Sequence, residues 1–308
     1  MNKYLPEGYL IRSEQNRQAV SSVGALKKAM ENGTILEGVC KLCDREHNLH
    51  VSVGEFEGII PRLEGAAGIE TGEVRDIALI SRVNKPVSFV VKGLTESENG
   101  ETRLLLSRRI VQERCREEYI SHMRPGDVLK AKITHMESFG VFADIGCGIN
   151  ALLPIDSISV SRIPHPNVRF VQGQEIMCIV KSIEDNRITL THKELLGTWE
   201  ENAKKFTPGE TVPGVVRSVE KYGIFVELAP NLAGLAEYVS GITAGQHASV
   251  YIKSMNPEKM KIKLIIIDNF DDETPPSVPE YFITDASHID YFRYSPVGSD
   301  KLIESNFI

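Results

Sequence analysis

The sequence contains no apolar run approaching the ~20 residues that a membrane-spanning helix needs. Its first ten residues, MNKYLPEGYL, lack the basic start and apolar middle of a signal peptide, so we expect a cytoplasmic protein with no membrane partner. Cysteine is scarce: the five cysteines are odd in number and scattered, which predicts free thiols and excludes a disulfide framework.

Motifs for catalysis are also missing. The sequence has no Gly-rich phosphate loop, no carboxylate pair and no nucleophile motif. Its histidines have no acid or nucleophile at a spacing typical of a catalytic site. We therefore expect no enzymatic activity, no cofactor and no small-molecule substrate.

An excess of positive charge, the usual mark of a nucleic-acid-binding protein, is absent, because the formal net charge is −7. The negative charge is concentrated at one end, where residues 269–308 carry 2 basic and 8 acidic residues. The remainder is close to neutral and has room for local basic faces, so the net charge does not exclude a nucleic-acid partner.

What the sequence does contain is a repeat. Residues 126–145 recur as residues 209–228: both copies open on glycine, and both close on an aromatic-Gly-aliphatic-Phe turn, Phe139 to Phe142 and Tyr222 to Phe225. A more divergent third copy starts at Gly33. Each copy continues into further short Val- and Ile-rich segments punctuated by glycine, five in all, which predicts a five-stranded barrel.

Helical periodicity appears between the copies. Residues 16–31, 108–123 and 193–206 each predict a helix, the last two as short linkers stopped by Pro-Gly. After an acidic, Pro-rich connector, the last segment holds many aromatic residues, so we expect it to fold back on a barrel.

The fold class is mainly β, with three tandem barrels. Its expected parts are an N-terminal segment with a helix (1–32), a degenerate barrel (33–107), a helical linker (108–125), a barrel (126–192), a helical linker (193–208), a barrel (209–268) and an acidic, aromatic tail (269–308).

The Gly opening, the aromatic turn, the later Gly-Leu segment and the closing strand resemble the S1 RNA-binding domain, clearly in the second and third copies and weakly in the first. The layout is similar to that of the ribosomal protein S1 family. The resemblance implies OB-fold barrels that bind single-stranded RNA, with mRNA bound during translation and the small ribosomal subunit as a further partner. The alternative is a protein-docking scaffold on the ribosome or an RNA-processing assembly, in which RNA binding is incidental.

Strand alternation supports an RNA-binding face. With Val141, Ala143 and Ile145 facing the core, Phe142 and Asp144 point outward, and Phe225 and Glu227 do the same in the third copy. An exposed ring offers a stacking platform for an unpaired base, and nearby cations hold the phosphates. The candidate RNA-binding residues are Phe139, Phe142, Lys130, Lys132, Lys181 and Arg187 in the second copy, and Tyr222, Phe225, Arg217, Lys221, Lys253, Lys261 and Lys263 in the third.

The first copy departs from this pattern. It has no aromatic turn, and His50 falls where Phe142 stands, so we expect weak RNA binding or docking against protein. Cys40, Cys43, His47 and His50 have a spacing compatible with zinc. The repeat register instead places Cys40 and Cys43 at core positions, so no metal site is predicted. We also expect the acidic tail to repel phosphate, so that its deletion strengthens RNA binding.

Overall fold

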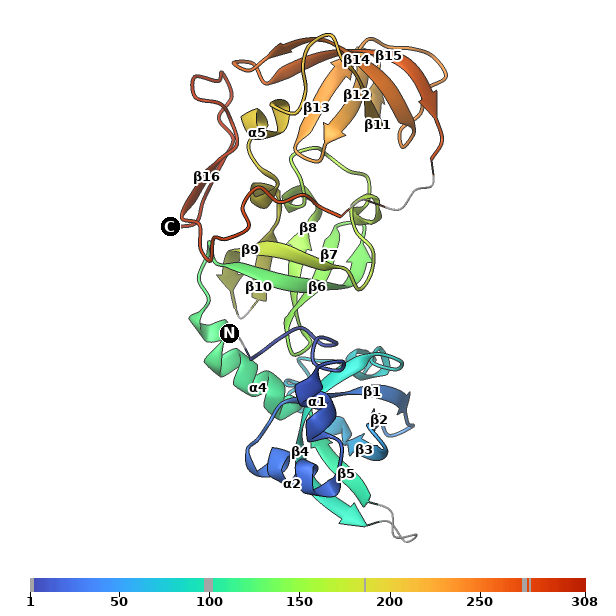
Figure 1. The fold of residues 1–308 in the computed structure, drawn as a ribbon, viewed down its shortest axis with the longest axis vertical. Coiled ribbons are helices and arrows are strands. Elements are labelled where there is room, and N and C mark those ends of the chain that lie inside the picture. Colours follow the sequence, from blue (N-terminus) through green and yellow to red (C-terminus); the bar gives the residue numbers. More distant parts are fainter. Residues whose placement is uncertain (1–2, 97–101, 186, 273–275, 277) are drawn as a thin grey trace. The chain divides into compact units, whose positions relative to one another are not determined.

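The computed structural model describes residues 3–96, 102–185, 187–272, 276 and 278–308. The protein is mainly β, and three closed five-stranded barrels follow one another along the chain, which confirms the predicted fold class (Figure 1). The chain divides into two compact units, Met1–Met123 with Asp144–Asn150, and Arg124–Ala143 with Ala151–Ile308.

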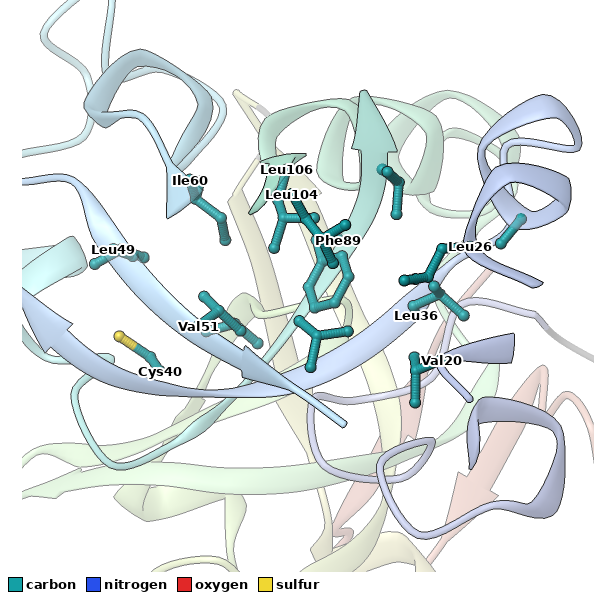
Figure 2. Packing of buried hydrophobic residues seen from close by; sticks show 14 of the residues in the cluster. Val20, Leu26, Leu36, Cys40, Leu49, Val51, Ile60, Phe89, Leu104 and Leu106 are labelled. Atoms are coloured by element: carbon teal, nitrogen blue, oxygen red, sulfur yellow. The ribbon is translucent and has the colours of Figure 1, made fainter. Parts of the chain in front are cut away.

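The first barrel has the strand order β1-β2-β3-β5-β4, closed by antiparallel pairing of β1 with β4. Its inward side chains form a dense core in which Cys40, Phe89 and Leu104 are fully buried (Figure 2). The strands are β1 (Leu36–Cys43), β2 (Leu49–Val53), β3 (Phe56–Ile60), β4 (Pro86–Glu96) and β5 (Thr102–Ser107). Two short elements, η1 (Arg62–Glu64) and α3 (Ile77–Ile80), lie between β3 and β4.

Two helices precede the first barrel, whereas the sequence pattern predicted one. They are α1 (Glu14–Ala19) and α2 (Val23–Glu31). The break has a local cause, because the Ser22 side chain accepts a hydrogen bond from the Ala25 N–H and so starts a new helix. Leu26 of α2 packs into the barrel core.

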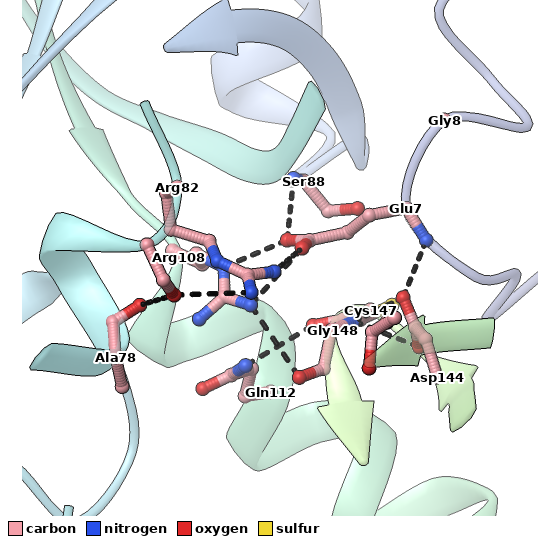
Figure 3. A network of polar contacts seen from close by, with 12 residues as sticks. Glu7, Gly8, Ala78, Arg82, Ser88, Arg108, Gln112, Asp144, Cys147 and Gly148 are labelled. Atoms are coloured by element: carbon pink, nitrogen blue, oxygen red, sulfur yellow. Dashed lines mark hydrogen bonds and ion pairs between the residues drawn. The ribbon is translucent and has the colours of Figure 1, made fainter. Parts of the chain in front are cut away.

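A buried polar network ties the first unit together (Figure 3). The Glu7 carboxylate binds the Arg108 guanidinium at 2.7 and 3.1 Å, and it accepts a hydrogen bond from the Ser88 N–H at 3.0 Å. Burial alone would raise the pKa of Glu7, but the Arg108 charge holds it below its usual range. The Glu7 N–H donates to Asp144 at 2.7 Å.

Asp144 corrects one prediction. Strand alternation placed it on the outer face, and it does point away from the barrel core, but it is only 1% exposed. Its carboxylate accepts from the N–H groups of Glu7, Gly146 and Gly148. Burial, with the nearby Glu7 charge, raises the pKa of Asp144 to about 7. Strand alternation predicts only the direction in which a side chain points. Whether that side chain is exposed to solvent depends on the segments that pack over it.

The second barrel has the order β10-β8-β7-β6-β9. Its strands are β6 (Val128–Glu137), β7 (Gly140–Gly146), β8 (Ile149–Pro154), β9 (Glu175–Glu184) and β10 (Arg187–Thr191). The third barrel repeats the plan of the first, in the order β11-β12-β13-β15-β14. Its strands are β11 (Thr211–Glu220), β12 (Gly223–Ala229), β13 (Leu232–Ala236), β14 (His247–Asn256) and β15 (Lys261–Phe270).

The segments between barrels are shorter as helices than predicted. Residues 108–123 form α4 (Arg109–Glu118) and η2 (Ile120–His122), and residues 193–206 form η5 (Lys193–Leu196) and α5 (Trp199–Ala203). Gly197 separates η5 from α5 at φ 82°, and a Cβ there would meet the Phe282 ring at 2.7 Å. Leu195 and Trp199 are buried, so the second of these segments is packed rather than solvated.

The tail folds back as expected. Its backbone continues the second barrel, because Val128 N–H donates to the Ser287 carbonyl and Ile289 N–H donates to the Gly126 carbonyl. Tyr294 belongs to the core of the third barrel and is 5% exposed. A final hairpin pairs β16 (Tyr291–Arg293) with β17 (Glu304–Asn306).

The tail also encloses a histidine whose pKa is strongly lowered. His192 Nδ1 lies 2.8 Å from the Ile158 carbonyl, which can only accept, so Nδ1 carries the proton. Its Nε2 lies 3.3 Å from the Tyr281 hydroxyl. Burial lowers the pKa of His192 to about 4.

Acid should therefore destabilise the second unit through His192. The unfolded chain takes up this proton near pH 6.5 but the folded chain only near pH 4, so stability is lost as the pH falls between these values. The expected loss is about 3 kcal/mol. Denaturation followed by Trp199 fluorescence checks it. His192→Asn, which keeps a donor for Ile158 and does not titrate, should lose clearly less over the same interval; an equal loss contradicts the assignment.

Candidate nucleic-acid interface

Both aromatic turns depend on glycine for a steric reason. A Cβ on Gly140 would lie 2.5 Å from the Leu153 carbonyl oxygen, and a Cβ on Gly223 would lie 2.5 Å from the Ala236 carbonyl oxygen. Only glycine permits this close approach between neighbouring strands. The turns therefore hold the aromatic residue before each glycine in the same position on both barrels.

The two turns present the same pair of rings. Phe139 and Phe142 meet edge to face with centroids 6.1 Å apart and an interplanar angle of 87°. Tyr222 and Phe225 do so at 6.2 Å and 86°. Phe139 is 55% exposed and Tyr222 is 71% exposed, while the second ring of each pair is half-buried. Each barrel thus offers one open ring supported by another.

Strand register places cations beside the rings of the third barrel. An outward row crosses four neighbouring strand pairs: Ser218 opposes Phe225, Phe225 opposes Leu235, Leu235 opposes Lys263, and Lys263 opposes Ser254. Lys263 is two strands from Phe225, or about 10 Å. Of the other predicted cations in this barrel, Lys221, Lys253 and Lys261 are exposed.

The second barrel carries a similar row with a different cation pattern. Leu152 opposes Thr189, and Thr189 opposes Ser182, so a neutral Thr189 occupies the place of Lys263. Arg187 is exposed at the start of β10, as Lys261 is at the start of β15. Lys130 is exposed and Lys132 is half-buried on β6. The exposed Lys181 donates to the Ser157 hydroxyl at 3.2 Å.

Arg217 does not join this group. Its guanidinium donates to Glu227 from Nε and Nη2, both at 2.9 Å, and its side chain is only 11% exposed. Glu227, predicted to face solvent, is 5% exposed because Arg217 and Arg169 cover it. Arg217 is therefore not an exposed cation on the aromatic face, and its predicted contact with RNA stays a prediction.

Sequence reasoning missed His135. Its ring stacks on the Phe142 ring, with centroids 6.4 Å apart and an interplanar angle of 20°. His135 therefore packs against the supporting ring of the pair. Its Nε2 lies 2.6 Å from Glu137 Oε1. The available signal was the repeat, because His135 aligns with Ser218, which stands opposite Phe225 in the third barrel.

The first barrel has an apolar row instead. His50 stands opposite Leu42, as Phe225 stands opposite Ser218, so the alignment of His50 with the aromatic position agrees with the strand register. The row continues through Ile59, Leu105 and Gly93. Leu42 is 52% exposed. His50 is the one ring in this row, and no Phe, Tyr or Trp stands there.

The cysteines of the first copy lie at core positions. Cys40 is fully buried, and Cys43 packs against the same cluster. Burial raises the pKa of both thiols. His50 faces Asp44 at 3.1 Å. Among the residues described, no cluster of three or more His, Cys, Asp or Glu side chains is placed to hold a metal ion. Nor does the described part of the chain include a helix both long and apolar enough to span a bilayer.

Three five-stranded barrels, two of which carry an open aromatic ring supported by a second ring, are typical of the class of single-strand-binding OB-fold proteins. Residues 123–193 match the family model of the S1 RNA binding domain. The chain is 29% identical over 293 residues to a small ribosomal subunit protein bS1 homolog of Bacillus subtilis, covering 92% of this chain and 73% of the relative. It is 28% identical over 270 residues to bS1 of Staphylococcus aureus, covering 85% and 65%. Residues 123–193 are therefore similar to an S1 RNA binding domain, and most of the chain resembles bacterial small ribosomal subunit proteins bS1.

Among solved structures, a multidomain protein with nucleic acid binding domains from Streptococcus pneumoniae matches with a TM-score of 0.25 and 12% identity. The match covers 77% of this chain and 74% of that one. The chain also spans only part of its bS1 relatives, just under two thirds of the Staphylococcus protein.

Proposed function

We propose that the chain binds single-stranded RNA, specifically mRNA, without catalysing a reaction, in an S1-like role in translation. The observation that carries the proposal is the pair of open rings, repeated with nearly the same geometry on two barrels. A ring that only filled a core would not be more than half exposed, as Phe139 and Tyr222 are. Stacking on such rings accepts any base.

The proposal assigns different roles to the three barrels. Residues 126–192 and 209–268 bind RNA, and the cations beside their rings contact the phosphates. Residues 33–107 bind RNA weakly or dock against protein. The similarity to bS1 of two bacteria supports the small ribosomal subunit as a partner and the cytoplasm as the location.

Salt dependence tests this proposal. Affinity for a short unstructured RNA should fall steeply as salt increases, by about 0.7 log unit per log unit of salt for each phosphate neutralised. A fluorescence anisotropy titration at several salt concentrations measures the slope. An uncharged nucleic-acid analogue of the same sequence serves as the control and should show almost no slope. The proposal is contradicted if the protein does not bind the RNA, or if its affinity for the RNA does not change with salt concentration.

A second candidate function is a protein-docking scaffold, in which RNA binding is incidental. The apolar row of the first barrel favours it, because Leu42, Ile59 and Leu105 together make a poor surface for phosphate. Sedimentation with ribosomal subunits separates the two functions. Binding through RNA should be lost at high salt, whereas docking through apolar contacts should persist.

A further inference from the structure

A charged cavity adjoins the aromatic face of the third barrel. Its volume is about 490 Å³, and it lies in the second unit, between the segment before β9 and the outer face of β11 and β12. The charged and titratable side chains that line it are Arg169, Arg217, Glu227, His247 and Asp272. Arg169 directly follows η4 (Pro166–Val168) of the second barrel.

Two arginines at the centre of the cavity share one acidic partner. Glu227 accepts two hydrogen bonds from Arg217 and one from Arg169 Nη2. One carboxylate therefore serves two guanidinium groups, each of which carries five N–H donors. Asp272, which also lines the cavity, lies 3.6 Å from His247 Nδ1. The two guanidinium groups at the centre thus share the single carboxylate of Glu227.

Arg169 shows the lack of a partner most directly. Its side chain is 10% exposed, and its Nε is buried without a hydrogen-bond partner in the part of the chain that the structure describes. A buried donor without an acceptor is costly, by an amount comparable to a lost hydrogen bond. Burial also lowers the pKa of Arg169 despite the adjacent Glu227. An anion entering the cavity would give this donor an acceptor.

The cavity continues the face that carries the rings. Phe225 and Glu227 are alternate residues on β12, so both point outward and lie about 7 Å apart. Arg217 precedes Ser218, the residue opposite Phe225. An RNA strand stacked on Tyr222 and Phe225 therefore has its backbone within reach of the two arginines.

We propose that Arg169 and Arg217 form a phosphate-binding site that takes a backbone phosphate of the RNA strand held by Tyr222 and Phe225. The planar guanidinium fork matches phosphate oxygens in a bidentate arrangement, which suits arginine better than lysine to this role. The inference rests on the proposed RNA-binding function and adds an anion contact contributed jointly by the second and third barrels. Glu227 holds the two arginines in place.

Arg169→Gln tests the site with little risk to the fold. The variant leaves Arg217 and Glu227 as a balanced pair and keeps an amide donor near Glu227. Affinity for an oligouridylate of about 12 nucleotides should fall about tenfold, the order expected for one lost charged hydrogen bond. The salt slope should become shallower by about 0.7. Arg162→Gln, which removes the same charge from an exposed residue of the same β8–β9 connection, is the matched control and should change affinity much less.

A second measurement reports the site without RNA. In an Nε–H correlation NMR spectrum, inorganic phosphate should shift the Arg169 resonance, identified by its loss in Arg169→Gln, and chloride at equal ionic strength should not. If phosphate causes no shift and Arg169→Gln binds RNA like Arg162→Gln, the site is overturned. A phosphate shift with unchanged RNA affinity overturns the assignment to the RNA backbone. If the wild-type protein binds no RNA, the proposed function fails, and the phosphate titration alone decides whether the cavity binds an anion.

Discussion

Alanine at both Phe139 and Phe142 should weaken binding of a short unstructured RNA by about 30- to 1,000-fold. Each stacked base contributes roughly 1 to 3 kcal/mol, so two rings account for about 2 to 4 kcal/mol once partial overlap is allowed for. Phe139 is the open ring and Phe142 supports it edge to face at 6.1 Å. Anisotropy titration measures the loss.

The matching pair on the third barrel should behave alike. Tyr222→Ala with Phe225→Ala should cost a similar factor, and the four substitutions together should remove measurable binding. Tyr291→Ala is the control, because Tyr291 is a comparably exposed aromatic (49%) in the tail hairpin. Circular dichroism should show the fold intact in every variant. Unchanged affinity in a folded double variant would exclude the aromatic turns as the binding surface.

Tyr294→Ala should destabilise the second unit by about 3 to 5 kcal/mol, the range for truncating a large buried aromatic side chain. The Tyr294 ring lies in the core of the third barrel, and its hydroxyl donates to the Asn231 carbonyl. Its own carbonyl accepts from the Trp199 N–H at 3.0 Å. Chemical denaturation followed by Trp199 fluorescence measures the loss, since Trp199 is buried in the same cluster and is the single tryptophan.

Tyr291→Ala again provides the control, with an expected change within about 0.5 kcal/mol for an exposed residue. Equal stability of the wild type and the Tyr294 variant would mean that the tail does not complete the barrel. The same contacts change the expectation for deleting residues 269–308. Deletion removes acidic charge, but it also removes Tyr294 from the core, so RNA binding should weaken as the third barrel loses stability.

Several parts of the structure could be predicted from local sequence. The repeated glycine marks a turn that excludes a Cβ, and both copies of this turn hold their aromatic pair in nearly the same geometry. Cys40 occupies the core position that the repeat register assigned to it. These predictions succeed because strand alternation and tight turns are set by neighbouring residues.

Other parts depend on segments that are distant in sequence. Asp144 and Glu227 alternate outward as predicted, yet Glu7 and Arg169 bury them from far along the chain. Ser22 is a residue type that favours the start of a helix, so the break between α1 and α2 could have been predicted from it. The apolar spacing of residues 16–31 instead predicted one continuous helix. The phosphate-binding site proposed for Arg169 and Arg217 has no sequence motif, because its two arginines come from different barrels.

The sequence by itself therefore determined that the protein is built from three barrels and that two of them carry the aromatic turn, since both follow from short-range spacing and sterics. Only the tertiary structure decided which outward residues reach solvent, how the tail completes the third barrel, and that Arg217 pairs with Glu227. Those outcomes depend on which distant segment covers a given face, and burial and charge compensation between distant segments leave no periodic signal in the chain.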